Sequence, residues 1–370
     1  MHKLVPPLSR AGVVLGVLAS ASAQATPLAQ ETLTQILANT GISASGYLAA
    51  SYYASTADNT YHQFDTAHDT FQFDQAGLTL GYQPKQGFGA LLDVIAGHDA
   101  KIVNAAESAS AASNNAFDLL QSYVQYVHGA LELQAGKFTT LAGAEVIAPT
   151  GNTNFSRSLL FYAEPMTHTG VRATYTVNST LSVIVGLNNG WNYTRVSSGP
   201  KTVELGLALN PSSRLSLTAQ SYIGNDPVDR ARRTLIDTVA TYNATAALQF
   251  VLSYDWGRQD ASAVTAVGRW SGVAAYLNQR LSRRWRVSLR GESLDDRNGF
   301  VTGTAQTLGD GTVTVGYDPT AQFELRLEGR YDHSNRPTFQ DSHFVTSSGR
   351  PLVRSSDHQS ELAVQGVYSF

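Results

Sequence analysis

The chain contains no cysteine in its 370 residues. Disulfides therefore cannot stabilise it, and thiolate catalysis and thiolate metal sites are excluded. A basic excess is also missing, because 26 Lys and Arg stand against 29 Asp and Glu. Since a nucleic-acid partner requires a basic face, we expect none. The nine histidines are scattered without an HxxxH pair, so we expect neither a metal nor a cofactor.

Long apolar runs are missing as well. One short run, 11–19, lies behind Lys3 and Arg10 and is followed by small-residue A-x-A sites within 21–25. This order is typical of a secretory signal peptide, and the run is too short to span a bilayer, which takes ~20 residues. We therefore predict that residues 1–25 are removed as a signal peptide, leaving 24 basic and 29 acidic residues.

What the chain does contain is a β-forming composition, with 31 Gly, 17 Tyr and 14 Phe, and a regular alternation of apolar and polar residues. In 321–333, for example, Leu325 and Leu327 alternate with Arg326 and Glu328. The mean hydropathy of −0.15 does not exclude a membrane, because the alternating strands of a membrane barrel are half polar. A period of two predicts strands with one face toward lipid and the other toward a polar lumen.

We predict an all-β fold, a transmembrane antiparallel β-barrel of about 16 strands (14 to 18) over residues 42–370. Short and long connections alternate along the chain, as periplasmic turns and extracellular loops do in such barrels, and an even strand number leaves both termini in the periplasm. Residues 26–41 fit a periplasmic linker or a short helix. The expected strands are 42–53, 70–82, 87–97, 116–128, 131–138, 168–177, 180–190, 200–210, 213–224, 232–243, 245–257, 268–280, 283–294, 304–317, 321–333 and 356–370, of which 116–128, 232–243 and 268–280 have an ambiguous alternation.

Aromatic residues collect near the ends of these strands, where their amphipathic rings suit the two headgroup belts of a membrane. The predicted belts consist of Tyr82, Tyr126, Tyr175, Tyr242, Tyr317 and Tyr368 toward the short turns, and Trp256 and Tyr331 toward the long loops. The chain also ends on an aromatic residue, Phe370, which closes an alternating strand.

The most specific stretch is 131–192. It contains GKF at 136–138, NTNFSRSLLF at 152–161, EPMTHTGVR at 164–172 and GLNNGWN at 186–192. With LRLEGRYDHS at 325–334, these motifs resemble the OmpL-like outer-membrane β-barrel porins over nearly the whole mature chain. The resemblance implies a porin in the lipid of a Gram-negative outer membrane, and it implies that Phe370 is a signal read by the barrel-insertion machinery. Whether the barrels associate as a homo-oligomer, for example a trimer, stays open.

A barrel of about 16 strands encloses an aqueous lumen, so inward charges line water. The longest connection, 139–167, mixes apolar and charged residues, and we predict that it folds into the lumen and sets the narrowest point of the pore. Glu145 and Glu164 would then face a wall of arginines across the aperture. The alternative is a loop that caps the barrel from outside. The candidate pore-lining and constriction residues are Glu145, Arg157, Glu164, Arg172, Arg284, Arg286, Arg290, Glu292, Arg326, Glu328 and Arg330.

The predicted function is a passive diffusion channel for small hydrophilic solutes or ions. Two other classes stay open. One is a non-conducting barrel that acts as a surface receptor or adhesin. The other is a barrel hydrolase, for which Ser156, His168 and Asn154 are candidate catalytic residues. A triad is recognised by geometry and not by spacing, and these residue types are common in loops, so we expect no enzymatic activity.

Overall fold

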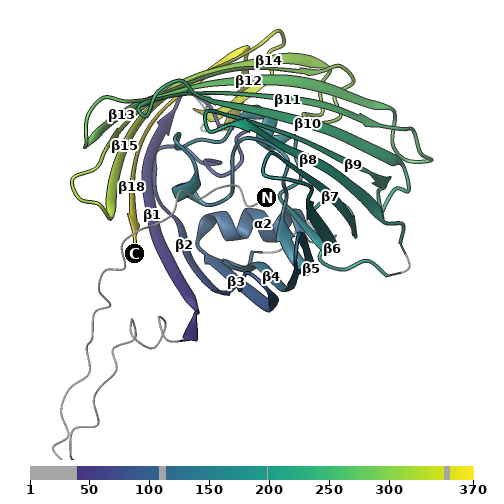
Figure 1. The fold of residues 1–370 in the computed structure, drawn as a ribbon. Coiled ribbons are helices and arrows are strands. Elements are labelled where there is room, and N and C mark those ends of the chain that lie inside the picture. Colours follow the sequence, from purple (N-terminus) through teal and green to yellow (C-terminus); the bar gives the residue numbers. More distant parts are fainter. Residues whose placement is uncertain (1–39, 108–113, 198, 346–350) are drawn as a thin grey trace, which may run out of the picture.

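A computed structural model describes residues 40–107, 114–197, 199–345 and 351–370. The predicted signal peptide, 1–25, and nearly all of the predicted linker, 26–41, lie outside the described residues. Sixteen strands of the described residues form a closed antiparallel barrel (Figure 1). They are β1 (Ser43–Ser55), β2 (Thr70–Tyr82), β3 (Gly87–Ala96), β4 (Phe117–His128), β5 (Leu131–Thr139), β6 (Thr167–Thr176), β7 (Leu181–Asn188), β8 (Thr202–Ser212), β9 (Leu215–Asn225), β10 (Arg232–Asn243), β11 (Leu248–Gln259), β12 (Gly268–Arg280), β13 (Trp285–Asp296), β14 (Gln306–Tyr317), β15 (Phe323–Ser334) and β18 (His358–Ser369).

Each of these strands pairs with its neighbours in sequence, and β18 pairs with both β15 and β1 to close the ring. The predicted fold class and strand number are confirmed, and the strand ends differ from the predicted ones by a few residues. Closure matters because every strand edge then has a partner, which a barrel in lipid requires.

The alternation of the sequence becomes an inner and an outer face. On β15, Leu325 and Leu327 point outward and are exposed, while Arg326, Glu328 and Arg330 point inward and are buried. The ambiguous alternation of β4 has a local cause. Its register with β3 shifts between Asp93 and Val94, so that β4 carries one extra residue there.

Two long connections, which are polar in sequence, contain secondary structure. The stretch 98–115 begins with the helix α2 (His98–Glu107), which Figure 1 shows inside the ring of strands. Its residues Ala100 and Val103 pack with Ile95 and Leu120 on the inner wall. The stretch 334–355 contains most of a separate two-stranded sheet, β16 (Phe339–Val345) with β17 (Pro351–Ser356). Among the described helices, none has the length and apolar character needed to cross a membrane.

The eight belt aromatics lie on strands with their rings on the outer face of the barrel. Six of them are strongly exposed there: Tyr82, Tyr175, Tyr242, Trp256, Tyr331 and Tyr368. Tyr126 and Tyr317 are half-buried because each packs on another outward ring, at centroid distances of 4.7 Å from Phe88 and 4.5 Å from Trp285. Their role in the headgroup belts stays a prediction.

Phe370 follows the closing strand directly. Its backbone N–H donates to the carbonyl of Gly46 on β1, and the N–H of Gly46 donates back to Phe370, both at 2.9 Å. The ring of Phe370 packs closely on Gly46, because a Cβ on this glycine would lie only 2.6 Å from the Cζ atom of Phe370. The last residue therefore completes the junction that closes the ring.

We predict that deletion of Phe370 lowers the yield of folded barrel in the outer membrane severely, because both the closing hydrogen bonds and the terminal aromatic signal are lost. The control is Phe323→Ala, which also removes one aromatic ring near the same end of the barrel. Membrane fractionation with a heat-modifiability gel measures the yield. Equal yields of the two variants would contradict the assembly role of Phe370.

Candidate functional site

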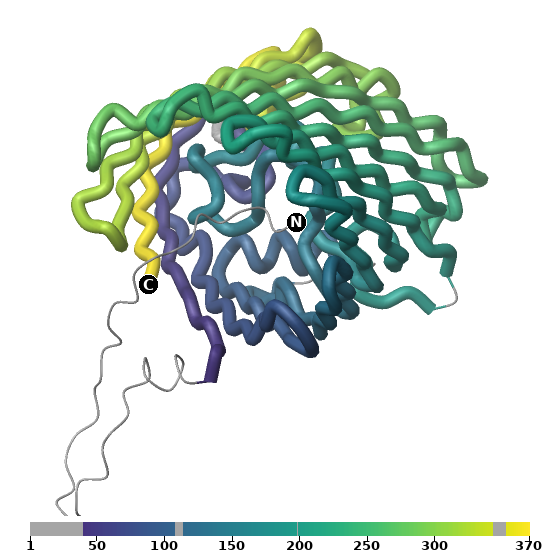
Figure 2. The backbone as a smooth tube through the Cα atoms, in the orientation of Figure 1, coloured from purple at the N-terminus to yellow at the C-terminus, as the bar shows by residue number. Residues whose placement is uncertain are grey.

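One connection turns into the barrel. Residues 140–166, here called the inward segment, leave β5 and return to β6, with the short helices η1 (Pro149–Gly151) and α3 (Leu159–Tyr162) between them. Of its 27 residues, 19 are buried and six are half-buried, and only Thr150 and Gly151 are exposed. Figure 2 shows this part of the backbone inside the ring of strands. The connection therefore folds into the barrel, as predicted, and the alternative of a loop that caps the barrel from outside is wrong.

The inward segment lies against an arginine wall, which we define as Arg286 and Arg290 of β13 with Arg326 and Arg330 of β15. Each arginine donates hydrogen bonds to backbone carbonyls of the segment. The acceptors are Thr153 for Arg286 (2.6 Å), Ser156 for Arg290 (2.8 Å), Pro149 for Arg326 (3.2 Å) and Arg157 for Arg330 (2.7 Å). Apart from the carbonyl of Pro149, which also accepts from the N–H of Asn152 in η1, these carbonyls thus find their partners on the wall.

Carboxylates of the same wall accept hydrogen bonds from the N–H groups of the segment. Glu328 accepts from the backbone N–H groups of Phe155 (2.6 Å) and Ser156 (2.9 Å). Its carboxylate also accepts from the hydroxyls of Ser156 and Thr314. Glu292 accepts from Leu159 (2.9 Å) and Leu160 (3.3 Å) at the start of α3. Donors and acceptors of the wall therefore alternate to match the backbone of the segment.

Apolar side chains complete the attachment. Consecutive residues of α3 enter three separate clusters: Leu159 packs with Leu235 and Trp270, Leu160 with Ala274 and Tyr276, and Phe161 with Phe64 and Ile95. Burial of three such side chains contributes roughly 1.5–3 kcal/mol each. One short turn of helix thus fixes the segment to several strands at once.

The charges of the arginine wall are paired. Arg290 forms ion pairs with Glu145 (3.2 Å), Glu292 (3.4 Å) and Asp310 (3.0 Å). Arg330 pairs with Asp310 (2.9 Å) and Asp332 (2.8 Å), while Arg286 and Arg326 share Glu324. Because every arginine of the wall has a carboxylate in contact, little net field leaves this wall.

Several sequence-predicted site residues differ in placement from the expectation. Glu145 touches the wall instead of facing it across an aperture. Glu164 lies beside Asp237 of β10 and Asp255 of β11, on another part of the wall. Arg284 precedes the first residue of β13 and is exposed in the turn, because the strand begins two residues later than predicted.

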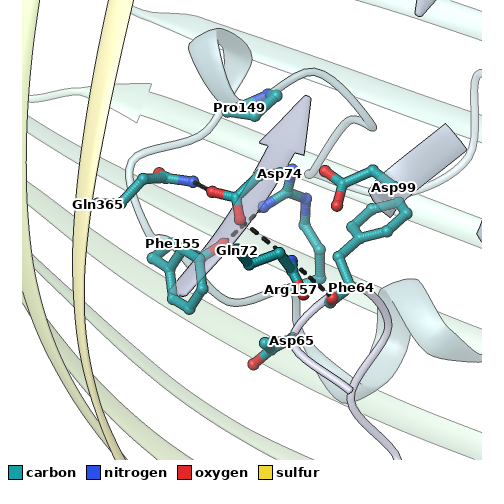
Figure 3. A pocket seen from close by; sticks show the side chains of 9 residues that line it. All are labelled: Phe64, Asp65, Gln72, Asp74, Asp99, Pro149, Phe155, Arg157 and Gln365. Carbon is teal, nitrogen blue, oxygen red and sulfur yellow. Dashed lines mark hydrogen bonds between the residues drawn. The ribbon is translucent and has the colours of Figure 1, made fainter. Parts of the chain in front are cut away.

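The other two predicted cations are buried inside. Arg157 donates to carbonyls of its own segment, at Val146 (2.9 Å) and Ile147 (2.7 Å), and its guanidinium lies 5.3 Å from the ring centre of Phe64. Figure 3 shows it among acidic side chains, and the space left there is only about 10 Å³, roughly the volume that one water needs. Arg172 pairs with Glu204 at 2.9 Å, away from the arginine wall.

A second connection, 56–69, also folds inward. Its most important residue is His62, which the sequence analysis did not identify. His62 donates to Asp65 (2.5 Å) in its own loop and to Asp332 (2.9 Å) on β15. Burial and Arg330 oppose the positive charge, but Asp65 and Asp332 outweigh them and raise the pKa of His62 to about 10. The histidine therefore stays charged at neutral pH and ties this loop to the wall. No spacing in the sequence brings positions 62 and 332 together.

The candidate hydrolase residues do not assemble. The hydroxyl of Ser156 donates to Glu328, while His168 bonds to the carbonyl of Gly190 and stacks on Tyr222. Asn154 donates to Thr314. Within the described part of the chain, no hydrogen bond joins any two of the three candidates.

A family model described as "Putative beta-barrel porin-2, OmpL-like" matches residues 41–370. The chain belongs to this porin family. As a member of this family, the porin is a channel protein of the Gram-negative outer membrane. Among curated protein sequences, none matches it.

Several solved structures share the fold at low sequence identity. OprB of Pseudomonas putida is 13% identical with a TM-score of 0.61, and the match covers 91% of this chain and 96% of that one. OmpT of Vibrio cholerae, in its trimer form, is 11% identical with a TM-score of 0.59 and coverages of 89% and 99%. An anion-selective porin from Comamonas acidovorans is 10% identical with a TM-score of 0.57 and coverages of 89% and 99%.

We predict that Glu328→Ala loosens the inward segment of the porin. The change leaves two buried N–H groups without an acceptor, at a cost of about 1–3 kcal/mol each. Amide hydrogen exchange of peptides covering 155–160, measured on the folded barrel in detergent, should accelerate. Glu132→Ala is the matched control, because Glu132 is a half-buried carboxylate of β5 that bonds Gln134 and not the segment. Unchanged exchange in a folded Glu328→Ala barrel would contradict the anchoring role.

Proposed function

We propose that the porin is a passive diffusion channel for small hydrophilic solutes or ions, and that the inward segment forms its narrowest part. One observation carries the proposal: a closed ring of sixteen strands holds, inside it, a segment bonded to the wall through its own backbone. Barrels of 16–18 strands are wide enough for an aqueous lumen, so a segment fixed inside narrows it.

Charge selectivity from the arginine wall should be weak. The four arginines contact Glu145, Glu292, Asp310, Glu324 and Asp332, so their charges are compensated where they stand. A transverse field of the predicted sign needs uncompensated positive charges, and each arginine of this wall already contacts a carboxylate. We therefore propose that size and polarity, more than the sign of the charge, select solutes at the inward segment.

The competing functions have less support. A hydrolase needs a nucleophile next to its base, and Ser156 is bonded to Glu328 and Arg290 instead of His168. A receptor or adhesin would not require the long anchored segment in the lumen. We therefore propose that the porin is not an enzyme and needs no cofactor.

We further propose that residues 1–25 are a cleaved signal peptide and that both termini face the periplasm, with the short turns on the same side. One matched structure is described as a trimer, and we propose the same association for this porin. The conductance recordings described next also test association, because three channels that insert together give conductance steps in groups of three.

Deletion of residues 148–160 should raise the single-channel conductance in planar bilayers, because the narrowest part of the lumen is removed. Ion selectivity should change too, since wall groups that now bond the segment would face water. Deletion of 261–266, in the exposed loop between β11 and β12, is the control and should leave both unchanged. If a correctly folded variant without 148–160 conducts like the natural porin, the inward segment is not the narrowest part of the channel.

Single cysteines test the orientation, because the natural chain has none to interfere. Ala263→Cys lies in the loop between β11 and β12, and Ser213→Cys lies in the turn between β8 and β9; both positions are exposed. A membrane-impermeant maleimide added to intact cells should label position 263 and not position 213. Labelling at 213 but not at 263 would reverse the proposed orientation.

A further inference from the structure

Three carboxylates from distant parts of the sequence meet inside the barrel. They are Glu164 of the inward segment, Asp237 of β10 and Asp255 of β11, and we call them the carboxylate triad. One oxygen of each lies within 4.8 Å of the oxygens of the other two. Asp237 and Asp255 are direct partners in the register of β10 and β11, so both side chains point into the lumen at one level. All three are buried, and Asp237 and Asp255 are 0% exposed.

Asp255 gives the second, independent observation. No backbone N–H, amide or hydroxyl group of the described residues donates to either of its oxygens, and it forms no ion pair with their Lys, Arg or His side chains; its side-chain partners are the carboxyl groups of Asp237 and Glu164. Glu328, a carboxylate buried as deeply, accepts from two backbone N–H groups and two hydroxyls. A buried carboxylate without such a donor is costly, and two neighbouring carboxylates make it more so.

Glu164 can take this position because the residue next to its carboxylate, Gly143, has no side chain. Gly143 has a φ of +77°, and a Cβ at that residue would lie 1.9 Å from Oε2 of Glu164. A residue other than glycine would be strained there and would also displace the carboxylate. The inward segment is thus shaped to bring Glu164 against β10 and β11. Ser253, one inward position before Asp255 on β11, adds a buried hydroxyl that also has no hydrogen-bond partner.

We propose that the carboxylate triad binds a divalent cation, and that calcium fits it best. The donors are oxygens only, which suits a hard cation. Calcium accepts six to eight oxygens in an irregular arrangement, so three carboxylates leave room for waters, whereas magnesium demands a near-ideal octahedron. A bound cation compensates the charge of Asp255 and joins the end of the inward segment to β10 and β11. The consequence for conduction rests on the proposed function, but the binding itself does not.

The experiment uses the mature full-length porin in detergent, stripped with EDTA and dialysed. Isothermal titration with CaCl₂ from about 10 µM to about 5 mM covers the affinities of sensor and extracellular calcium sites. We expect one calcium per barrel, a rise in the midpoint of thermal unfolding with calcium, and binding at least tenfold weaker in Asp255→Asn. The control is Asp93→Asn on β3, a buried carboxylate bonded to Thr79 and Gln121 outside the triad, which should bind calcium as the natural porin does.

A variant in the segment guards against misfolding of a strand variant. Glu164→Gln changes no strand residue, and it should also weaken calcium binding at least tenfold while a heat-modifiability gel reports a folded barrel. The proposal is overturned if the natural porin binds no calcium, or if both triad variants bind it as tightly as Asp93→Asn does. Because binding is measured without a bilayer, failure of the channel proposal and failure of this site give different results.

Discussion

The interior of this barrel depends on the pairing of polar groups that water no longer reaches. A ring of sixteen strands is too wide for its own side chains to fill, so a segment of chain enters and brings unpaired carbonyl and N–H groups with it. The wall provides both donors and acceptors for these groups. Guanidinium groups such as that of Arg330 donate to carbonyls, and carboxylates such as that of Glu328 accept from N–H groups. Had the wall held only one sign of charge, half of the backbone groups would stay unsatisfied.

This requirement explains why the arginines come with acids. Arg290 and Arg330 share Asp310 of β14, the strand between theirs, and each also pairs with a carboxylate two residues further along its own strand, Glu292 or Asp332. A buried guanidinium needs both a counter-charge and acceptors for its remaining N–H groups. The carboxylates give the first and the carbonyls of the inward segment give the second. What reads as a charged pore lining in the sequence is, in the structure, an interface between the wall and the segment.

The fold was accessible from the sequence because a period of two states which face each residue takes, and strands that face lipid must close into a ring so that no edge stays unpaired. The same period does not state what lies opposite a side chain. Glu145 and Glu164 look equivalent in the sequence, yet one touches Arg290 and the other lies beside Asp255, because the path of the segment between them is set by tertiary contacts. Arg284 was misplaced for a simpler reason, since a strand start shifted by two residues turns an inward position into a turn. The helix α2 was missed because His98–Glu107 is short and half of its residues are polar, and its contacts with the wall, such as those of Val103 and of Glu107 with Lys137, are tertiary.

The two ends of the inward segment are held by different physics. Its middle part, from Pro149 to Leu160, is bonded to β13 and β15 through charge-assisted hydrogen bonds that need nothing from outside the chain. Its last part brings Glu164 to two further carboxylates, where like charges repel and no backbone N–H, amide or hydroxyl group of the described residues donates to Asp255. Apolar contacts such as that of Leu159 with Leu235 attach the segment to β10, and a cation bound at the proposed site would add to that attachment.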